Sequence, residues 1–272
     1  LPRDILRQEI ARLESLGVKI CTGVAVGRDI QWNTLEGYQA VLVATGLPQS
    51  RRVLDIESAV DGVHDGLEFL GQVAEGSPPR VGRHVVVVGG GNVAIDAARC
   101  AIRLGASEVS LVCVEPADGM PAHTEELEAA VLEGVNLQCG FAVRQPVVIN
   151  GRIAALEITR VRFLGREPDG GVRFVPVGGA VPPLVAHTVI QAIGQEADLG
   201  FLPQDLAGSR RLAADEWGRL QKTMVFGAGD VVSGSARVVD AIGAGKRVAM
   251  GIHRQLNGES GDGADDVVQT VQ

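Results

Sequence analysis

One stretch, residues 84–101, constrains the fold more than any other part of the chain. It reads His-Val-Val-Val-Val-Gly-Gly-Gly-Asn-Val-Ala-Ile-Asp-Ala-Ala-Arg-Cys-Ala. A run of valines is typical of a buried parallel strand, and the segment after the glycines has the composition and spacing of a helix. The sequence therefore predicts a strand, a tight glycine turn and a helix, which is how the βαβ units of α/β folds begin.

The glycine turn has the features of a dinucleotide-binding cradle. Gly89 permits the tight turn, Gly91 lets the backbone approach a pyrophosphate, and Ala94 is the small residue that helix-on-strand packing requires. We expect Asn92 to cap the helix, whose free N–H groups would face the phosphates. The candidate cofactor residues of this turn are Gly89, Gly90, Gly91, Asn92, Val93 and Ala94. An ordinary strand-to-helix turn without a ligand is the alternative interpretation.

An acidic residue ends the next predicted strand, Glu108–Glu115, which follows a helix stop at Gly105. Glu115 stands close to the spacing of about 20 residues beyond the cradle at which a carboxylate accepts hydrogen bonds from the adenosine ribose and disfavours a 2′-phosphate. We therefore expect NAD(H), unless Arg83, Arg99 or an arginine brought in from elsewhere changes the preference. The alternative for Glu115 is a solvated strand end.

Charge and apolar content narrow the class of function. The 272 residues carry a net charge of −8, which argues against nucleic acid as a partner because nothing would neutralise its phosphates. Apolar residues make up 46% of the chain and aromatic residues 3%, so we expect a core of Val, Leu, Ile and Ala. Apolar runs fall short of the roughly 20 residues of a membrane span. We see no signal peptide before the first helix and expect a cytoplasmic protein.

The spacing of cysteine and histidine indicates neither a metal site nor dithiol chemistry. The cysteines, Cys21, Cys100, Cys113 and Cys139, are widely separated, and we expect each to be a small buried hydrophobe. The five histidines show no ligand spacing, and the sequence shows no pattern of a nucleophile with its base. Any chemistry would come from bound cofactors.

The rest of the chain reads as alternating helices and strands. Before the cradle we expect a helix at Pro2–Leu16, strands at Val18–Ala25 and Ala40–Ala44, and a helix at Gly66–Val73. After it we expect a helix capped by Thr124 with Leu127 and Val131 facing inward, an antiparallel excursion within residues 137–177, and a strand at His187–Ile193. A last strand at Met224–Asp230 precedes a helix with Val238, Val239 and Ile242, and then a mobile tail from Asn257 to Gln272.

Six short motifs occur in order along the chain. They are Leu1-Pro2-Arg3-Asp4, Ala44-Thr45-Gly46, Gly89-Gly90-Gly91-Asn92, Met120-Pro121-Ala122, Ala192-Ile193-Gly194-Gln195 and Gly227-Ala228-Gly229-Asp230. With them the chain resembles the glutamate synthase small-subunit family, which includes the flavin end of dihydropyrimidine dehydrogenase. The resemblance covers Leu1 to Leu256.

The resemblance implies an α/β fold of the two-dinucleotide-binding-domain flavoprotein type. A Rossmann-like NAD(P)-binding domain with an antiparallel β excursion, residues 79–197, would be inserted into a partial FAD-binding domain, residues 1–78 and 198–257. Residues 258–272 would form the flexible tail.

The resemblance also implies cofactor-binding residues outside the cradle. Thr45 and Gly46 would lie near the flavin, and Gly229 and Asp230 would hold the ribitol or pyrophosphate region of FAD. The backbone at Arg237 and Val238 would face the isoalloxazine ring, where a helix N-terminus stabilises the charge of reduced flavin. Ile193, Gly194 and Gln195 complete the expected set, and none of the residues acts as a catalytic acid or base.

Two departures from the family pattern matter. Related subunits carry an arginine pair for the 2′-phosphate of NADP(H) where this chain has Val114 and Glu115, which again favours NAD(H). The family's first strand–glycine–helix unit, which holds the FAD pyrophosphate, and its cysteines for iron–sulfur clusters have no counterpart here. We therefore expect a fragment, or one part of a split protein, that binds FAD weakly or not at all by itself.

The expected function is that of an electron-transfer oxidoreductase subunit passing hydride between NAD(P)H and FAD. Electrons would continue to an iron–sulfur or large catalytic subunit, and the oligomeric state stays open. The alternative is a nucleotide-binding or assembly module that binds NAD(H) without turnover. A self-contained dehydrogenase is disfavoured because the sequence has no Tyr-x-x-x-Lys pair and Tyr38 is its only tyrosine.

Overall fold

The computed structural model of the protein describes residues 2–54, 60–167, 171–207, 210–221, 223–234 and 236–258. The helices are α1 (Arg3–Ser15), α2 (Gly66–Ala74), α3 (Asn92–Arg103), α4 (Thr124–Leu132), α5 (Asp230–Ser233) and α6 (Val238–Leu256), with 3-10 helices at Trp32–Gly37 and Ala117–Gly119. The strands are β1 (Val41–Val43), β2 (Gln49–Ser50), β3 (Val63–Asp65), β4 (His84–Val88), β5 (Glu108–Cys113), β6 (Val135–Cys139), β7 (Phe141–Ile149), β8 (Arg152–Arg166), β9 (Val172–Pro176), β10 (Leu184–Val185), β11 (Thr188–Gln191), β12 (Gln195–Glu196) and β13 (Val225–Gly227).

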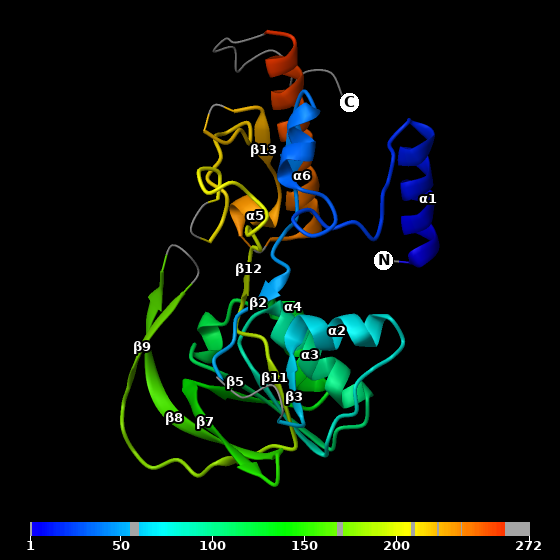
Figure 1. Cartoon of the computed structure of the whole chain (residues 1–272). Coiled ribbons are helices and arrows are strands. Elements are labelled where there is room, and N and C mark those ends of the chain that lie inside the picture. Colours follow the sequence, from blue (N-terminus) through cyan, green and yellow to red (C-terminus); the bar gives the residue numbers. More distant parts are fainter. Residues whose placement is uncertain are drawn as a thin grey trace.

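A five-stranded parallel sheet forms the centre of the lower half of the molecule in Figure 1. Its strand order is β3-β11-β4-β5-β6, so the valine-rich strand β4 is flanked by β11 and β5. Both faces of such a strand are covered, which explains why its residues form a continuous apolar run rather than an alternating one.

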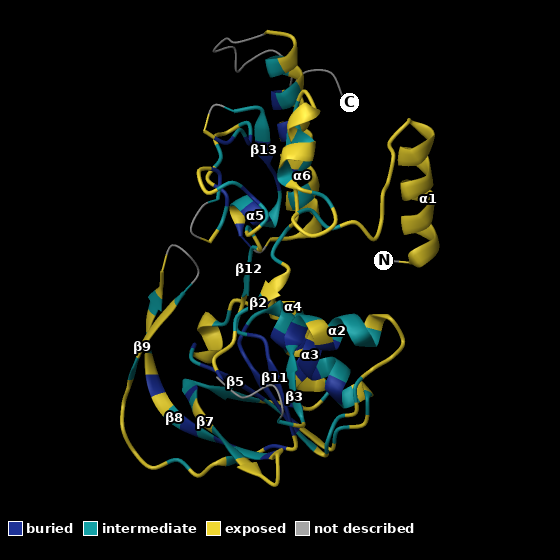
Figure 2. Cartoon of the chain, in the orientation of Figure 1, coloured by how far each residue is buried: buried dark blue, intermediate teal, exposed yellow. Residues whose placement is uncertain are grey.

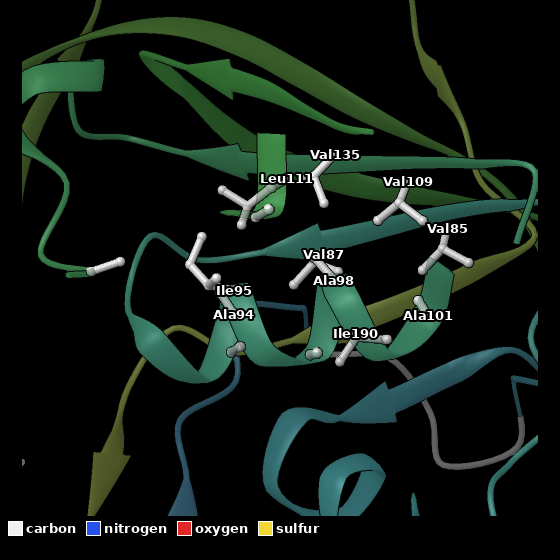
Figure 3. Packing of buried hydrophobic residues seen from close by; sticks show 14 of the residues in the cluster. Val85, Val87, Ala94, Ile95, Ala98, Ala101, Val109, Leu111, Val135 and Ile190 are labelled. Carbon is white, nitrogen blue, oxygen red and sulfur yellow. The ribbon is translucent and has the colours of Figure 1, made fainter. Parts of the chain in front are cut away.

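Helices α2, α3 and α4 cover one face of this sheet. Val85 and Val87 of β4 point to this face and meet the small residues Ala94, Ala98 and Ala101 of α3, as Figure 3 shows. Alanine lets the helix backbone approach the strand closely, and each fully buried valine contributes about 1.5–3 kcal/mol. The expected role of Ala94 in helix-on-strand packing is therefore seen in the structure, where its side chain is fully buried.

An antiparallel sheet covers the opposite face. The alternate residues of β4, Val86 and Val88, pack there against Ile153 and Leu156 of β8. Strand β8 pairs with β7, β9 and β10, all antiparallel. The expected antiparallel excursion is thus present, but it begins at β7, because residues 137–139 belong to β6 of the parallel sheet.

Apart from α1, the remaining elements form a second group above the sheet, which we call the α6 unit (residues 25–48 and 197–258). Strands β1 and β13 pair in parallel beside α5 and α6, with small cores that include Val43, Leu220 and Phe226. We call residues 49–196 the cradle unit. The chain passes between the two units through β2 and β12, which pair with each other in antiparallel fashion. The predicted domain boundaries stay a prediction.

Several local predictions are wrong. Residues 18–25 form no strand, and an isolated bridge joins Val26 to Ile30, because this segment has no neighbouring strand with which to pair. Helix α1 forms as expected, yet none of its described residues is buried (Figure 2). Helix α4 begins at Thr124 with His123 at the N-cap position, and Val131 is 49% exposed instead of facing inward.

Burial of the cysteines and of the last helix also differs from expectation. Cys113 is buried, whereas Cys21 is exposed and Cys100 and Cys139 are half-buried. Val238, Val239 and Ile242 of α6 are exposed, whereas Val248 on the same helix is buried. In the part of the chain that the structure describes, none of the helices is long and apolar enough to cross a membrane. The expected tail lies, from residue 259 on, outside the described residues.

Candidate functional site

The cradle glycines occupy the turn between β4 and α3, and they differ in what they require. Gly89 has φ 135°, and a Cβ there would lie 2.2 Å from the Ala192 carbonyl oxygen, so the turn admits only glycine at this position. A Cβ at Gly91 would meet nothing within 4 Å. Gly91 therefore faces open space at the N-terminus of α3, where a phosphate can approach the backbone.

Asn92 does not cap α3 as expected. Gly91 is the N-cap residue, Asn92 is the first residue of the helix, and its Oδ1 accepts a hydrogen bond from the His123 amide at 2.9 Å. The Ala122 amide likewise donates to the Gly90 carbonyl at 3.2 Å. The side chain of Asn92 thus fastens the segment after Met120 to the cradle.

Glu115 lies beyond the end of β5 and is only 5% exposed, so the alternative of a solvated strand end is wrong. Its Oε1 forms an ion pair with the guanidinium of Arg166, the last residue of β8. Its Oε2 is directed toward the cradle, because a Cβ built on Gly90 would lie 3.1 Å from it. A carboxylate so deeply buried requires a cation and hydrogen bonds to stay charged.

The arginines named from the sequence do not reach Glu115. Arg99 pairs with Glu133 at 2.6 Å between α3 and α4, where the Arg99 and Arg103 guanidinium groups hold the pKa of Glu133 below its usual value. Arg83 precedes β4 and thus lies at the opposite end of the sheet. The arginine that does reach Glu115 is Arg166, which comes from a distant part of the chain. No local sequence signal could have placed it there, since 51 residues separate it from Glu115.

A cavity of about 900 Å³ opens above the cradle and brings most of the expected residues together. Its lining includes Gly89, Gly90, Gly91, Asn92, Val93, Glu115, Ile193, Gly194, Gln195 and Arg237. Residues that the sequence reasoning missed line it too, among them Phe141, Arg166, Phe174, Arg210 and Arg211. The expected residues Thr45, Gly46, Gly229, Asp230 and Val238 are not among its lining residues, and Ala94 lies in the core beneath the cradle.

The α6 unit contributes a charged rim to this cavity. Arg237 precedes α6 and pairs with Asp240 at 3.0 Å, and this pairing lowers the pKa of the Asp240 carboxyl. Gly229 has φ 73° and directly precedes Asp230, the first residue of α5. The expected contacts of these residues with a flavin stay predictions.

The cradle fits a nicotinamide dinucleotide better than the α6 unit fits FAD. The cradle offers an open glycine, a helix N-terminus and a buried carboxylate that faces the turn. In the α6 unit, the described residues form one pair of parallel strands, β1 and β13, and the glycine turn after β13 leads into α5, which is only four residues long.

Curated relatives match almost the whole chain. The NADP(+)-dependent formate dehydrogenase subunit beta of Moorella thermoacetica is 38% identical over 94% of this chain and 37% of its own length. The NAD-dependent dihydropyrimidine dehydrogenase subunit PreT of Escherichia coli K12 is 30% identical, covering 95% of this chain and 58% of the relative. The glutamate synthase [NADPH] small chain of Halomonas elongata is 30% identical, covering 93% of this chain and 57% of the relative. The chain thus spans between about a third and three fifths of these relatives.

Solved structures confirm the predicted fold class. FprA of Mycobacterium tuberculosis in complex with NADPH superimposes with a TM-score of 0.68 at 16% identity, covering 86% of this chain and 68% of FprA. Thioredoxin reductase of T. acidophilum gives a TM-score of 0.60 at 18% identity, covering 80% of this chain and 66% of the reductase.

The family model described as pyridine nucleotide-disulphide oxidoreductase matches residues 6–245. This match and the named relatives confirm the resemblance seen in the motifs, and the family agrees with the expected pair of cofactors, a nicotinamide dinucleotide and FAD. The chain belongs to the pyridine nucleotide-disulphide oxidoreductase family.

Proposed function

We propose that this chain is the nicotinamide-binding part of an electron-transfer oxidoreductase subunit that passes hydride between NAD(P)H and FAD, with NADH preferred. The observation that carries the preference is Glu115, a buried carboxylate beside the cradle whose Oε2 is directed toward Gly90. Such a carboxylate accepts hydrogen bonds from ribose hydroxyls and repels a 2′-phosphate. The names of the relatives include both NAD and NADP, so the preference rests on this residue.

The side chains of the site bind and orient rather than transfer protons. Hydride transfer between a nicotinamide and a flavin is the chemistry that the two cofactors supply when bound. Gly91 and the N-terminus of α3 would hold the pyrophosphate, Glu115 the adenosine ribose, and Ile193 and Gly194 after β11 the nicotinamide half. Holding the two cofactors in a productive orientation would supply a large part of the rate enhancement.

We propose an iron–sulfur or large catalytic subunit as the partner. The supporting observation is that relatives carry names such as NADPH-Fe(3+) oxidoreductase subunit beta of Geobacter sulfurreducens, 32% identical over 94% of this chain and 42% of that protein. A partner would receive electrons from the flavin.

Parallel calorimetric titrations with NADH, NADPH and FAD test the proposal, followed by anaerobic reduction of added FAD by NADH. We expect NADH to bind more tightly than NADPH. The double variant Val114→Arg, Glu115→Arg should reverse that order, because it replaces the buried carboxylate by two cations. Unchanged relative affinities would contradict the assignment of Glu115 to the ribose.

A second function, a nucleotide-binding or assembly module without turnover, is favoured by the single cradle among the described residues. Reduction of bound flavin by NADH in the longest native form of the protein separates the two functions. NADH binding to that form without any reduction of the flavin would support the module and contradict the oxidoreductase.

A further inference from the structure

We propose that Arg166 is a specificity-determining residue of the cradle: its guanidinium neutralises Glu115 and supplies the cation for a 2′-phosphate, so that NADPH is accepted beside NADH. This inference rests on the proposed function, because it assigns a role in choosing the cofactor of that same site. It adds a residue of the antiparallel excursion, Arg166 of β8, to Glu115 as a determinant of cofactor choice.

The path of β8 explains why Arg166 reaches the cradle. The register between β8 and β9 shifts between Phe163 and Gly165, and Gly165 has φ 125°. A bulge of this kind re-aims the side chain that follows it. Arg166 and its strand neighbour Val172 both line the cavity, and the guanidinium pairs with Oε1 of Glu115.

The two oxygens of Glu115 face different partners. Oε1 is paired with Arg166, whereas Oε2 is directed toward Gly90. A ribose with free hydroxyls can therefore donate to Oε2 without disturbing the ion pair. NADH binding keeps the buried charge of Glu115 compensated.

A 2′-phosphate changes this balance. It would bring a second anion next to the carboxylate, and the repulsion is strong because Glu115 is only 5% exposed. Arg166 lies beside this carboxylate, and its guanidinium has five N–H donors in a planar arrangement that matches phosphate oxygens. The Arg166 side chain is 38% exposed, whereas the Glu115 side chain is 6% exposed. Arg166 is therefore not fixed in the core and can turn toward a phosphate. One guanidinium can then hold both anions.

The neighbouring Arg173 does not offer this combination. Arg173 lies on β9 opposite Gly165, but it pairs with Glu167 at 3.0 Å, is 60% exposed and is not among the residues that line the cavity. It provides a matched control, because its removal deletes the same charge from the same strand pair.

The test measures the dissociation constants of NAD+ and NADP+ for the full chain by calorimetry at pH 8. Arg166→Met keeps the apolar stem and removes the charge; we expect NADP+ to bind at least about tenfold more weakly and NAD+ to change less than about threefold. Arg173→Met should leave both constants as in the wild type.

A second variant keeps the proposal falsifiable if Arg166→Met does not fold. Glu115→Gln preserves the shape, removes the carboxylate and leaves Arg166 to the phosphate, so NADP+ should bind about tenfold more tightly. That gain should vanish in the double variant Glu115→Gln, Arg166→Met.

The outcomes separate the two proposals. If both nucleotides bind and the ratio of their dissociation constants changes in Glu115→Gln but not in Arg166→Met, the role of Arg166 is overturned and the proposed function stands. If the ratio changes in neither variant, the role of Arg166 and the assignment of Glu115 to the ribose are both overturned. If the wild type binds neither nucleotide, the nicotinamide site itself is overturned, and the inference falls with it.

Discussion

Two glycines that stand two positions apart in the cradle serve different physical ends. Gly89 is required by the backbone, since a Cβ would collide with the Ala192 carbonyl oxygen. Gly91 is not required by the fold, because the space beside it is open. The pattern of glycines was visible in the sequence, but this division of roles was not, because the residues that approach Gly89 come from the end of β11, about a hundred positions later.

A pair of substitutions tests the division. Gly91→Val should leave the melting temperature within about 2 °C of the wild type and abolish NADH binding, because the side chain projects into the open space. Gly89→Ala should lower the free energy of unfolding by at least about 2 kcal/mol, because of its positive φ and the collision. Thermal unfolding followed by calorimetry measures both. A Gly91→Val protein that fails to fold would show that Gly91 is structural.

At the scale of elements, a buried glutamine joins β11 to the segment that follows β2. Gln191 is 4% exposed, and its Oε1 accepts hydrogen bonds from the amides of Val53 at 3.0 Å and Leu54 at 2.9 Å. Amides removed from water need such an acceptor.

Gln191→Leu should destabilise the protein by about 2–4 kcal/mol, because it leaves the two amides without their acceptor. Gln191→Glu at about pH 4 retains a neutral carbonyl acceptor and should cost less, whereas at pH 7 an unpaired buried carboxylate would add a cost of its own. Urea unfolding of the two variants beside the wild type gives the comparison; equal stability of Gln191→Leu and the wild type would refute the role of the hydrogen bonds.

The contact of α3 with α4 carries a pH dependence. Burial, and to a lesser extent the charge of Glu126, raise the pKa of Asp96 above its usual value. The folded protein thus favours the protonated carboxyl, so the contribution of Asp96 is most favourable at low pH. It is lost as the pH rises from the unfolded pKa, near 4, through the raised folded pKa.

Asp96→Asn should therefore stabilise the protein at pH 7, by roughly a few tenths of a kcal/mol since solvent screens this half-exposed group, and have no effect near pH 3. Melting temperatures of variant and wild type at both pH values measure the difference. A stabilisation of the same size at both would contradict the titration of Asp96.

How far the sequence predicts an element depends on how local its determinants are. The strand and helix around the cradle are encoded by adjacent residues, as are α2 and the pairing of β8 with β9, and these were predictable. The absent strand over residues 18–25 was not, because a strand depends on a partner that the segment itself does not specify. Arg166 was invisible for the same reason: its function follows from a bulge and a long-range pairing.

At the scale of the molecule, the two units have separate cores. The buried residues on both faces of the parallel sheet come from positions between 54 and 192, whereas the α6 unit has its own smaller clusters. Cores that share few residues fold independently.

A fragment of residues 49–197 should accordingly fold by itself and bind NAD+ within about tenfold of the full chain, because only rim residues of the cavity, such as Arg237, are lost. Circular dichroism and calorimetric titration of the fragment check this expectation. A fragment without cooperative unfolding would show that the α6 unit is needed for the fold.

The pairing of β2 with β12 means that the chain enters and leaves the cradle unit at one place, with Ser50 opposite Gln195 and Gln49 opposite Glu196. Cutting the chain once in β2 and once in β12 would therefore release the whole cradle unit. A homologous cradle unit with different residues at positions 115 and 166 could be joined to the same two strand ends. Recombination at this junction is a route by which such proteins can exchange one electron donor for another while the rest of the chain keeps its course.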